Sequence, residues 1–287
     1  MKVSGFSFIR NGLKLDYPFI ESIQSILPIC DEFLIAVGDS EDETLKKIID
    51  LQNSKIKIIP TVWDETIREG GRILAQQTDI ALREISGDWG FYLQGDEVIH
   101  EKFLPLIKKA MEDHLENPEV EGLLFNYKHF YGSYDFVGNS PKWYRREVRI
   151  VRNKPGICSY RDAQGFRRNG RKLRVKKTEA EVYHYGWVRN PKAQQLKQVS
   201  FNKLWHDDQW VKDNVVEATE ADYNLFESLL PFNGTHPAVM QERLKNMTWK
   251  FHYDPSKRQL TWKEVVKINW EKWTGYRLGE YRNYKII

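Results

Sequence analysis

The chain has 287 residues, of which 29% are charged and 41% are hydrophobic. This balance is typical of a folded globular protein and not of a disordered one. No apolar run approaches the roughly 20 residues that a membrane span needs, and the N-terminus lacks the apolar core of a signal peptide, so we expect a cytoplasmic protein. The net charge of +4 is unevenly spread, because residues 142–177 (the basic band) hold fourteen Lys and Arg against Glu147 and Asp162, a charge of +12.

Four apolar runs in the first hundred residues predict strands at residues 3–9, 32–37, 56–59 and 89–93. The stretches between them space their apolar residues as one face of a helix does. The first helix begins near Pro18, since proline is well suited to a first helical position. The second begins at Ser40, which with Glu43 has the form of a capping box, and buries Leu45, Ile48 and Ile49.

The third helix covers residues 70–85. Alternating strands and helices predict an α/β fold with a mostly parallel central sheet and helices on both of its faces. A helix near residues 101–115 and a strand at 122–131 follow. Residues 132–180 are only weakly periodic and predict short antiparallel strands, such as 147–152, joined by long loops.

Residues 192–217 have a helical pattern, and the chain from residue 224 onward is rich in tryptophan. For most of these tryptophans (Trp249, Trp262, Trp270, Trp273) we expect a buried structural role. We therefore divide the chain into a domain of residues 1–190 and a helical, aromatic-rich C-terminal extension of residues 191–287 that packs on it.

Each of the first four strands ends in polar residues, and in open α/β sheets ligands bind beyond the carboxyl ends of the strands. The four ends are Arg10-Asn11, Asp39, Trp63-Asp64 and Asp96-Glu97. Adjacent carboxylates such as Asp96 and Glu97 can hold Mg²⁺ or Mn²⁺ together with the oxygens of a diphosphate. The alternative is a solvated loop in which Glu97 begins the next helix.

Three further side chains have two interpretations each. Asp39 either contacts a nucleotide base or ribose, or caps a helix; because Ser40 already fits the capping box, the ligand role is favoured. His184 is either a third metal ligand or a buried histidine packed among tyrosines. Asp162, one of two acids in the basic band, is either a general base for an acceptor hydroxyl or a salt-bridge partner of Arg161 or Arg167.

The strand ends and the helix between them resemble, in order and spacing, the family 2 glycosyltransferases of the GT-A fold, which is Rossmann-like. The resemblance covers roughly residues 1–190 and is carried by residues 10–11, 38–40, 71–75 and 87–97. Gln94 stands where the family has the first acid of its Asp-x-Asp motif, so that the metal depends mainly on Asp96.

The resemblance implies a hexosyltransferase that uses a nucleotide-diphosphate sugar, with UDP as the first candidate, and inverts the anomeric centre. Asp39 would contact the base and Arg72 the phosphates, while Arg10 and Gln94 would line the same donor site. Asp96, with Glu97 or His184, would hold Mn²⁺ or Mg²⁺. An aspartate from the second half would be the base, and Asp162 is our candidate.

The expected acceptor is a glycan or a lipid-linked hydroxyl in the synthesis of a cell-surface polysaccharide. The basic band suits an anionic membrane surface, at which we expect the protein to be peripheral. The alternative is a non-catalytic GT-A-like module that binds carbohydrate or a polyanion through this band and the tryptophans. We expect no nucleic-acid partner, and a nucleotidyltransferase would need a glycine-rich basic loop that residues 10–13 do not supply.

Overall fold

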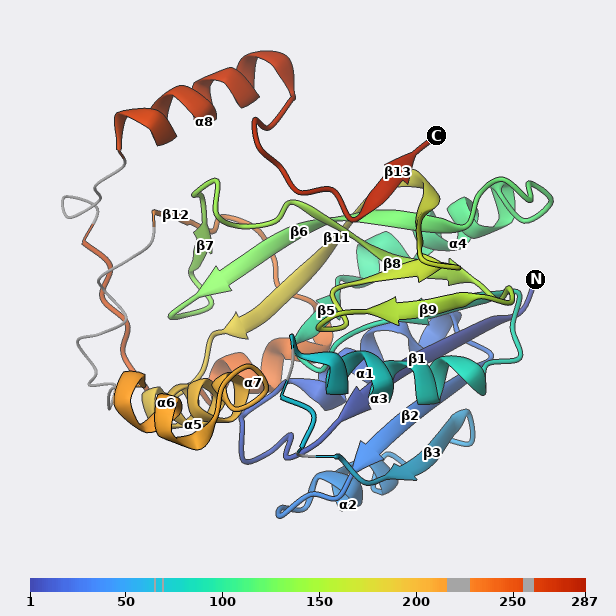
Figure 1. The fold of residues 1–287 in the computed structure, drawn as a ribbon, viewed down its shortest axis with the longest axis horizontal. Helices are drawn as coiled ribbons and strands as arrows, with labels where there is room; N and C mark the ends of the chain where they lie inside the picture. The colour runs from blue at the N-terminus through green and yellow to red at the C-terminus, as the bar shows by residue number, and fades with distance from the viewer. Residues whose placement is uncertain (65, 69, 216–227, 255–260) are drawn as a thin grey trace.

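The computed structural model describes residues 1–64, 66–68, 70–215, 228–254 and 261–287 (Figure 1). The last two residues of the predicted 192–217 helix and the first residues of the tryptophan-rich segment lie outside these ranges. Among the described helices, none combines the length and the apolar character that crossing a bilayer requires.

The first half of the chain builds a parallel sheet, as predicted. Its strands are β1 (Val3–Ile9), β2 (Glu32–Gly38), β3 (Ile56–Thr61) and β4 (Trp89–Tyr92). They lie in the order β3-β2-β1-β4, and every neighbouring pair is parallel. Nearly all side chains of β1 and β2 are buried, which is the pattern of strands that are covered on both faces.

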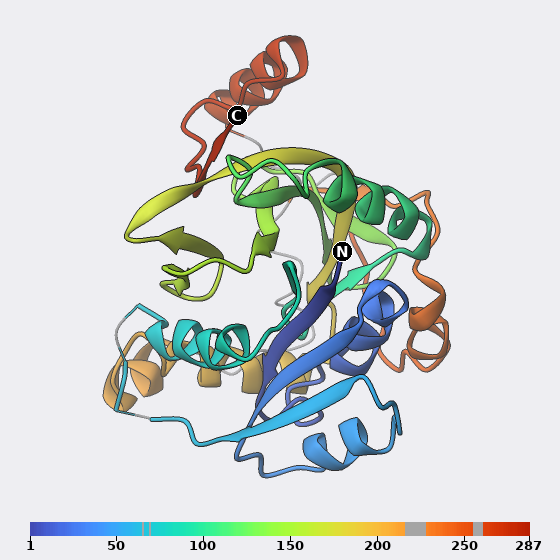
Figure 2. The same ribbon diagram turned by 90° about the vertical axis from the view of Figure 1, so that its right-hand side faces the viewer.

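Helices cover both faces of this sheet (Figure 2). Successive side chains of a strand point to opposite faces, and those of β2 divide accordingly: Phe33 and Ile35 belong to one hydrophobic cluster, Leu34 and Ala36 to another. The first cluster also contains side chains of three helices, and the second contains side chains of α3 (Arg72–Arg83). The three helices are α1 (Phe19–Ile26), α2 (Thr44–Ile49) and α4 (Leu104–Asp113).

The helix α2 corrects two details of the prediction. It begins at Thr44, and the Ser40 hydroxyl does not cap it; instead it donates to the Gly38 carbonyl and accepts from the Asn11 amide. The Thr44 amide donates to the Asp42 carboxylate. Leu45 and Ile49, predicted to be buried, are exposed. The helix has only six residues, and of these only Thr44 and Ile48 are buried.

The second half extends the same sheet. The antiparallel strand β8 (Arg146–Arg152) lies between β4 and β6 (Gly122–Tyr131), and β11 (Arg171–Trp187) then pairs with β6 in parallel. The described sheet is completed by shorter strands: β5 (Glu97–Ile99), β7 (Phe136–Gly138), β9 (Ile157–Tyr160), β10 (Gly165–Arg168), β12 (Leu229–Pro231) and β13 (Tyr284–Ile286).

The prediction of long loops up to residue 180 is wrong for β11. This strand has 17 residues and curls around the second half of the sheet (Figure 2). Its alternation is interrupted by two shifts of register, between Lys177 and Glu181 and between His184 and Trp187, which hid the strand from a search for strict period two. Glu97, expected at the start of a helix in the solvated-loop interpretation, begins the short strand β5.

The last hundred residues contain the helices α5 (Pro191–Asn202), α6 (Asp208–Asn214), α7 (Gln241–Lys245) and α8 (Trp262–Thr274). The predicted 192–217 helix is broken after α5, and the Asp207 side chain caps α6. The strands β12 and β13 pair with β7 and β11, so backbone hydrogen bonds join the C-terminal residues to the sheet. The expected burial of the tryptophans is wrong for Trp262, Trp270 and Trp273, which are 72%, 42% and 82% exposed on a helix that stands away from the rest of the chain (Figure 1).

Candidate functional site

The carboxyl ends of the parallel strands open into a cavity of about 950 Å³, which lies within the size range of small-molecule sites. Its walls come from the ends of β1 and β3 and from the loop after β4, and the helix α5 lines it from Gln194 to Asn202. Of the predicted site residues, this cavity brings together Arg10, Gln94, Asp96, Asp162 and His184. Asp39, Arg72 and Glu97 are not among the residues that line it.

Asp39 and Arg72 lie outside the cavity for different reasons. Asp39 follows Gly38 at the rim, where its side chain is 53% exposed and its carboxylate lies 3.4 Å from Arg10 Nε. The same Arg10 nitrogen donates to the Asp39 carbonyl oxygen at 3.0 Å. Arg72 is the first residue of α3 and is exposed to solvent. Asp39 therefore orients a cavity residue, whereas Arg72 lies outside the cavity lining.

Asp96 lies at the centre of the site. Its Oδ2 atom is 3.2 Å from Lys197 Nζ and 3.7 Å from His184 Nε2. Burial opposes ionisation, but the charges of Lys197 and Arg189 hold the pKa of Asp96 well below its usual range. Gly186 makes this approach possible, because a Cβ at that position would lie 2.5 Å from His184 Nε2 and 2.7 Å from Asp96 Oδ2.

His184 is held in its neutral form. Burial lowers the pKa of His184 to about 4, and its Nδ1 lies 2.9 Å from Nδ1 of the neighbouring His129. Burial likewise lowers the pKa of His129, to about 3. The Nε2 atom of a neutral His184 is thus directed toward Asp96.

Glu97 belongs to the interior and not to the cavity. Both of its oxygens accept hydrogen bonds from Arg149 at 2.7 Å, and both side chains are 0% exposed. The Tyr127 hydroxyl and the backbone amide of Gln94 also donate to this carboxylate. A carboxylate with this many donors has no lone pair directed at the cavity, so Glu97 positions the loop after β4 from behind.

Asp162 lies in a strained turn at the cavity wall. Its neighbours Arg161 and Ala163 have φ angles of 55° and 60°, in the left-handed region that non-glycine residues seldom adopt. The turn is fixed by the Gln94 side-chain amide, which donates to the Ala163 carbonyl at 3.3 Å. Burial raises the pKa of the Asp162 carboxyl above its usual value. Strain of this kind is concentrated at functional sites.

Asp162 also meets the start of α3. Gly71 precedes this helix with a φ of 68°, and a Cβ there would lie 2.8 Å from Cβ of Asp162. Gly71 therefore allows the left-handed backbone at this position and leaves room for the Asp162 side chain.

Two cavity residues were given no role in the site from the sequence. Lys197 is 101 positions from Asp96 and lies on a helix whose sequence predicts nothing beyond its helical pattern. Trp63 packs against Phe8 and under the guanidinium of Arg10, 5.6 Å from the ring. Its signal was visible in the Trp63-Asp64 strand end, since an aromatic ring at the edge of a nucleotide-sized cavity can stack on a base.

The residues present do not fit the predicted Mn²⁺ or Mg²⁺. Across the described ranges, no three His, Cys, Asp or Glu side chains form a group that could hold a metal ion. Of the three predicted ligands, Glu97 is turned into Arg149 and Asp96 has an ammonium beside it, while His184 Nε2 lies 3.7 Å from Asp96 Oδ2. A hard cation needs an accessible carboxylate, and the carboxylate of Asp96 already has a cationic partner.

The fold and the cavity thus define an α/β protein with a nucleotide-sized site at the carboxyl edge of its parallel strands. No protein-family model matches the chain, and a search of curated protein sequences found no match. Among solved structures, the chain is similar to residues 1–349 of TarS from S. aureus, at 14% identity and a TM-score of 0.40, over 76% of this chain and 70% of that one.

Two further structures are similar to parts of the chain. The complex of TarS 1–349 with UDP matches at 15% identity and a TM-score of 0.42, over 75% of this chain and 69% of that one. Glucosyl-3-phosphoglycerate synthase from Mycobacterium tuberculosis, in complex with Mg²⁺ and UDP, matches at 19% identity and a TM-score of 0.29, over 45% and 43% of the two chains.

Proposed function

We propose that the protein is a glycosyltransferase that moves a hexose from a nucleotide-diphosphate sugar, with UDP as the first candidate, to a hydroxyl of a glycan or a lipid-linked acceptor. The observation that carries this proposal is the cavity itself. It joins the ends of β1, β3 and β4 and places an aspartate on each of two walls, the buried Asp96 and the half-buried Asp162. A structure that only bound carbohydrate would not need a carboxyl in a strained turn.

The donor has a natural orientation in this cavity. Trp63 and Arg10, at the end nearest β3, offer a ring and a guanidinium to a nucleotide base. Asp39 holds Arg10 in place. In this arrangement Arg10 contacts the base, and Asp39 acts on the base through Arg10. The diphosphate then extends toward Lys197, and the sugar lies between Asp96 and Asp162.

The proposed reaction is a single displacement with inversion. The acceptor hydroxyl attacks the anomeric carbon while the bond from that carbon to the diphosphate oxygen breaks, and the electron pair of that bond leaves with the diphosphate. The Asp162 carboxylate takes the hydroxyl proton. Its raised pKa suits a general base, because proton affinity increases with pKa.

The test of the donor site is a thermal-shift panel with UDP, GDP, CDP and uridine. We expect saturating UDP to raise the Tm of the wild type by about 3 °C or more and Trp63→Ala to remove most of this shift. The matched control is Trp273→Ala, which changes a tryptophan that is 82% exposed on α8 and should leave the shift intact. If no nucleoside diphosphate stabilises the wild type, the proposal of a transferase is wrong.

We further propose that the protein works at the cytoplasmic face of an anionic membrane, and that α8 is the contact. At 100° per residue, Trp262, Val266 and Trp273 form one exposed stripe of this helix. The opposite side holds Glu271, which binds Arg145, the residue before β8, and Arg277, which follows α8 in the chain. Outward tryptophans flanked by lysines are the pattern of a helix that lies in a membrane interface.

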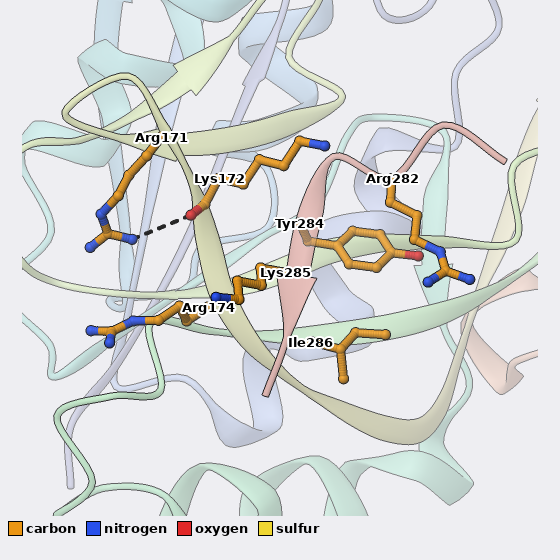
Figure 3. Close-up of a pocket in the computed structure, with 7 residues that line it drawn as sticks. All are labelled: Arg171, Lys172, Arg174, Arg282, Tyr284, Lys285 and Ile286. Carbon is orange, nitrogen blue, oxygen red and sulfur yellow. Dashed lines mark hydrogen bonds between the residues drawn. The ribbon is translucent and has the colours of Figure 1, made fainter.

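A second, basic cavity near α8 supports the same orientation. It has a volume of about 860 Å³ and lies beside β13, at the end of the molecule that also carries α8 (Figures 1 and 3). Its lining includes five cations: Arg171, Lys172, Arg174, Arg282 and Lys285. Three of the five have carboxylate partners: Arg171 pairs with Glu121, Arg174 with Glu119 and Arg282 with Glu280. Elsewhere in the predicted basic band, Arg149 pairs with Glu97 and Arg168 with Glu121.

Sedimentation with vesicles tests this contact. We expect enrichment on phosphatidylglycerol vesicles over phosphatidylcholine vesicles and a loss of that enrichment in Trp262→Ala/Trp273→Ala. The control is Trp63→Ala, whose tryptophan lines the donor cavity. Equal sedimentation with both lipids would count against a membrane role, and the exposed stripe would then be examined as a glycan-binding surface.

A further inference from the structure

One cation lies where the diphosphate of a donor would need a positive charge. Lys197 Nζ is 3.2 Å from Asp96 Oδ2 and donates to the Gly186 carbonyl at 2.7 Å. Its side chain is only 16% exposed, and Lys197 itself lines the cavity. An ammonium has three N–H donors; the described residues accept two of them, which leaves one for a ligand.

The surroundings keep a positive charge at this point. The Lys197 ammonium stays in contact with the Asp96 carboxylate. Arg189 lies nearby, 0% exposed and bonded to the carbonyls of Leu15 and Gly186. Two cationic side chains, Lys197 and Arg189, therefore accompany the single carboxylate of Asp96.

A divalent cation at Asp96 would meet this arrangement unfavourably. Bound at Oδ2, it would share that oxygen with the Lys197 ammonium, and like charges at such distances repel strongly in a buried site. Of the other predicted ligands, Glu97 faces Arg149, while His184 Nε2 lies 3.7 Å from Asp96 Oδ2. Gln94, which stands in place of an acid of the Asp-x-Asp motif, and Lys197, which supplies a positive charge, line the same cavity.

We propose that Lys197 takes the place of a divalent cation: its ammonium binds the diphosphate of the donor, and the sugar is transferred without a bound metal. This inference rests on the proposed function. As the bond between the anomeric carbon and the diphosphate oxygen breaks, negative charge grows on the diphosphate, and the N–H groups of Lys197 stabilise it. The hydroxyl proton goes to Asp162, so no further reactant is needed.

The experiment is calorimetric titration of UDP and of uridine into the purified protein, once with EDTA and once with MnCl₂. We expect wild-type Kd values for UDP that agree within about twofold in the two buffers. Lys197→Met, which keeps the length of the side chain, should weaken UDP binding at least about tenfold, the loss expected for a charge-assisted hydrogen bond. It should leave uridine binding unchanged, because uridine lacks the diphosphate.

The matched control is Lys192→Met, on the exposed side of the same helix and outside the cavity, which should bind UDP as the wild type does. Loss of UDP binding in EDTA and its return with MnCl₂ would overturn the inference and leave the proposed function standing. Equal UDP affinity in Lys197→Met and the wild type would also overturn it. If the wild type binds UDP in neither buffer, the proposed function fails and the inference fails with it.

Discussion

The carboxylate of Glu97 and the guanidinium of Arg149 form two hydrogen bonds of 2.7 Å, with both side chains fully buried. The pair connects β5 to β8 directly behind the loop that carries Asp96. Arg149 also stacks over the rings of Tyr92 and Tyr127. The pair therefore fixes the floor of the cavity.

Breaking this pair on one side should be costly. Glu97→Gln leaves the guanidinium of Arg149 buried without its counter-charge, and we expect a loss of roughly 3–5 kcal/mol in the free energy of unfolding. Urea denaturation followed by tryptophan fluorescence measures it. Asp113→Asn, which removes the exposed pair with Lys109, should cost less than about 1 kcal/mol. A similar loss in the two variants would contradict the structural role of Glu97.

Stability should fall with rising pH because of Glu147. Burial raises the pKa of this carboxyl from 4.5 to about 8, so between these values the folded protein keeps a proton that the unfolded chain has released. The contribution is complete below pH 4.5 and is lost as the pH rises to about 8. Glu147→Gln cannot titrate, and its denaturation midpoint should fall less across this window than that of the wild type.

Glu121 provides a control of opposite sign. Although burial opposes it, hydrogen bonds from Arg171, Arg174 and Arg168 lower the pKa of Glu121 to about 2. Its contribution is therefore present above pH 4.5 and is lost as the pH falls toward 2. Glu121→Gln should destabilise the protein at neutral pH while leaving the fall between pH 4.5 and 8 in place. If the denaturation midpoint of Glu147→Gln falls between pH 4.5 and 8 as steeply as that of the wild type, the Glu147 carboxyl does not cause this fall.

Asp162→Asn should separate catalysis from binding. The amide fits the same turn but cannot accept a proton, so we expect transfer to slow by about 10²–10⁴-fold with the Kd for UDP unchanged within about twofold. Release of UDP from UDP-glucose and UDP-N-acetylglucosamine measures the rate. Asp50→Asn, on the exposed end of α2, is the matched control, and a wild-type rate in Asp162→Asn would exclude Asp162 as the base.

Gly186→Ala tests the crowding around Asp96. The added Cβ would meet His184 Nε2 at 2.5 Å and Asp96 Oδ2 at 2.7 Å, so Asp96 has to move away from Lys197. We expect at least about a tenfold loss in UDP affinity with the far-ultraviolet circular dichroism of the wild type. Gly170→Ala has no atom within 4 Å of its Cβ and should affect stability alone, through its left-handed backbone. Unchanged UDP affinity in Gly186→Ala would show that the contact is not needed.

The sequence by itself determined the parallel strands and their order of appearance, because runs such as 33–37 are apolar at every position and only a sheet covered on both faces buries them. It also determined that polar residues follow those strands. The Gln94-Gly95-Asp96 loop was therefore predicted from the strand that precedes it, and Asp162 from its place among the cations of the basic band.

Only the tertiary structure decided what each polar residue faces. Asp96 lies in the turn before β5 and lines the cavity, while Glu97 begins that strand and turns inward to Arg149. The partner of Asp96, Lys197, comes from a helix 101 residues away, and its position depends on how β11 curls and on the register shift beside His184. Local periodicity contains no information about either, because both are set by packing across the sheet.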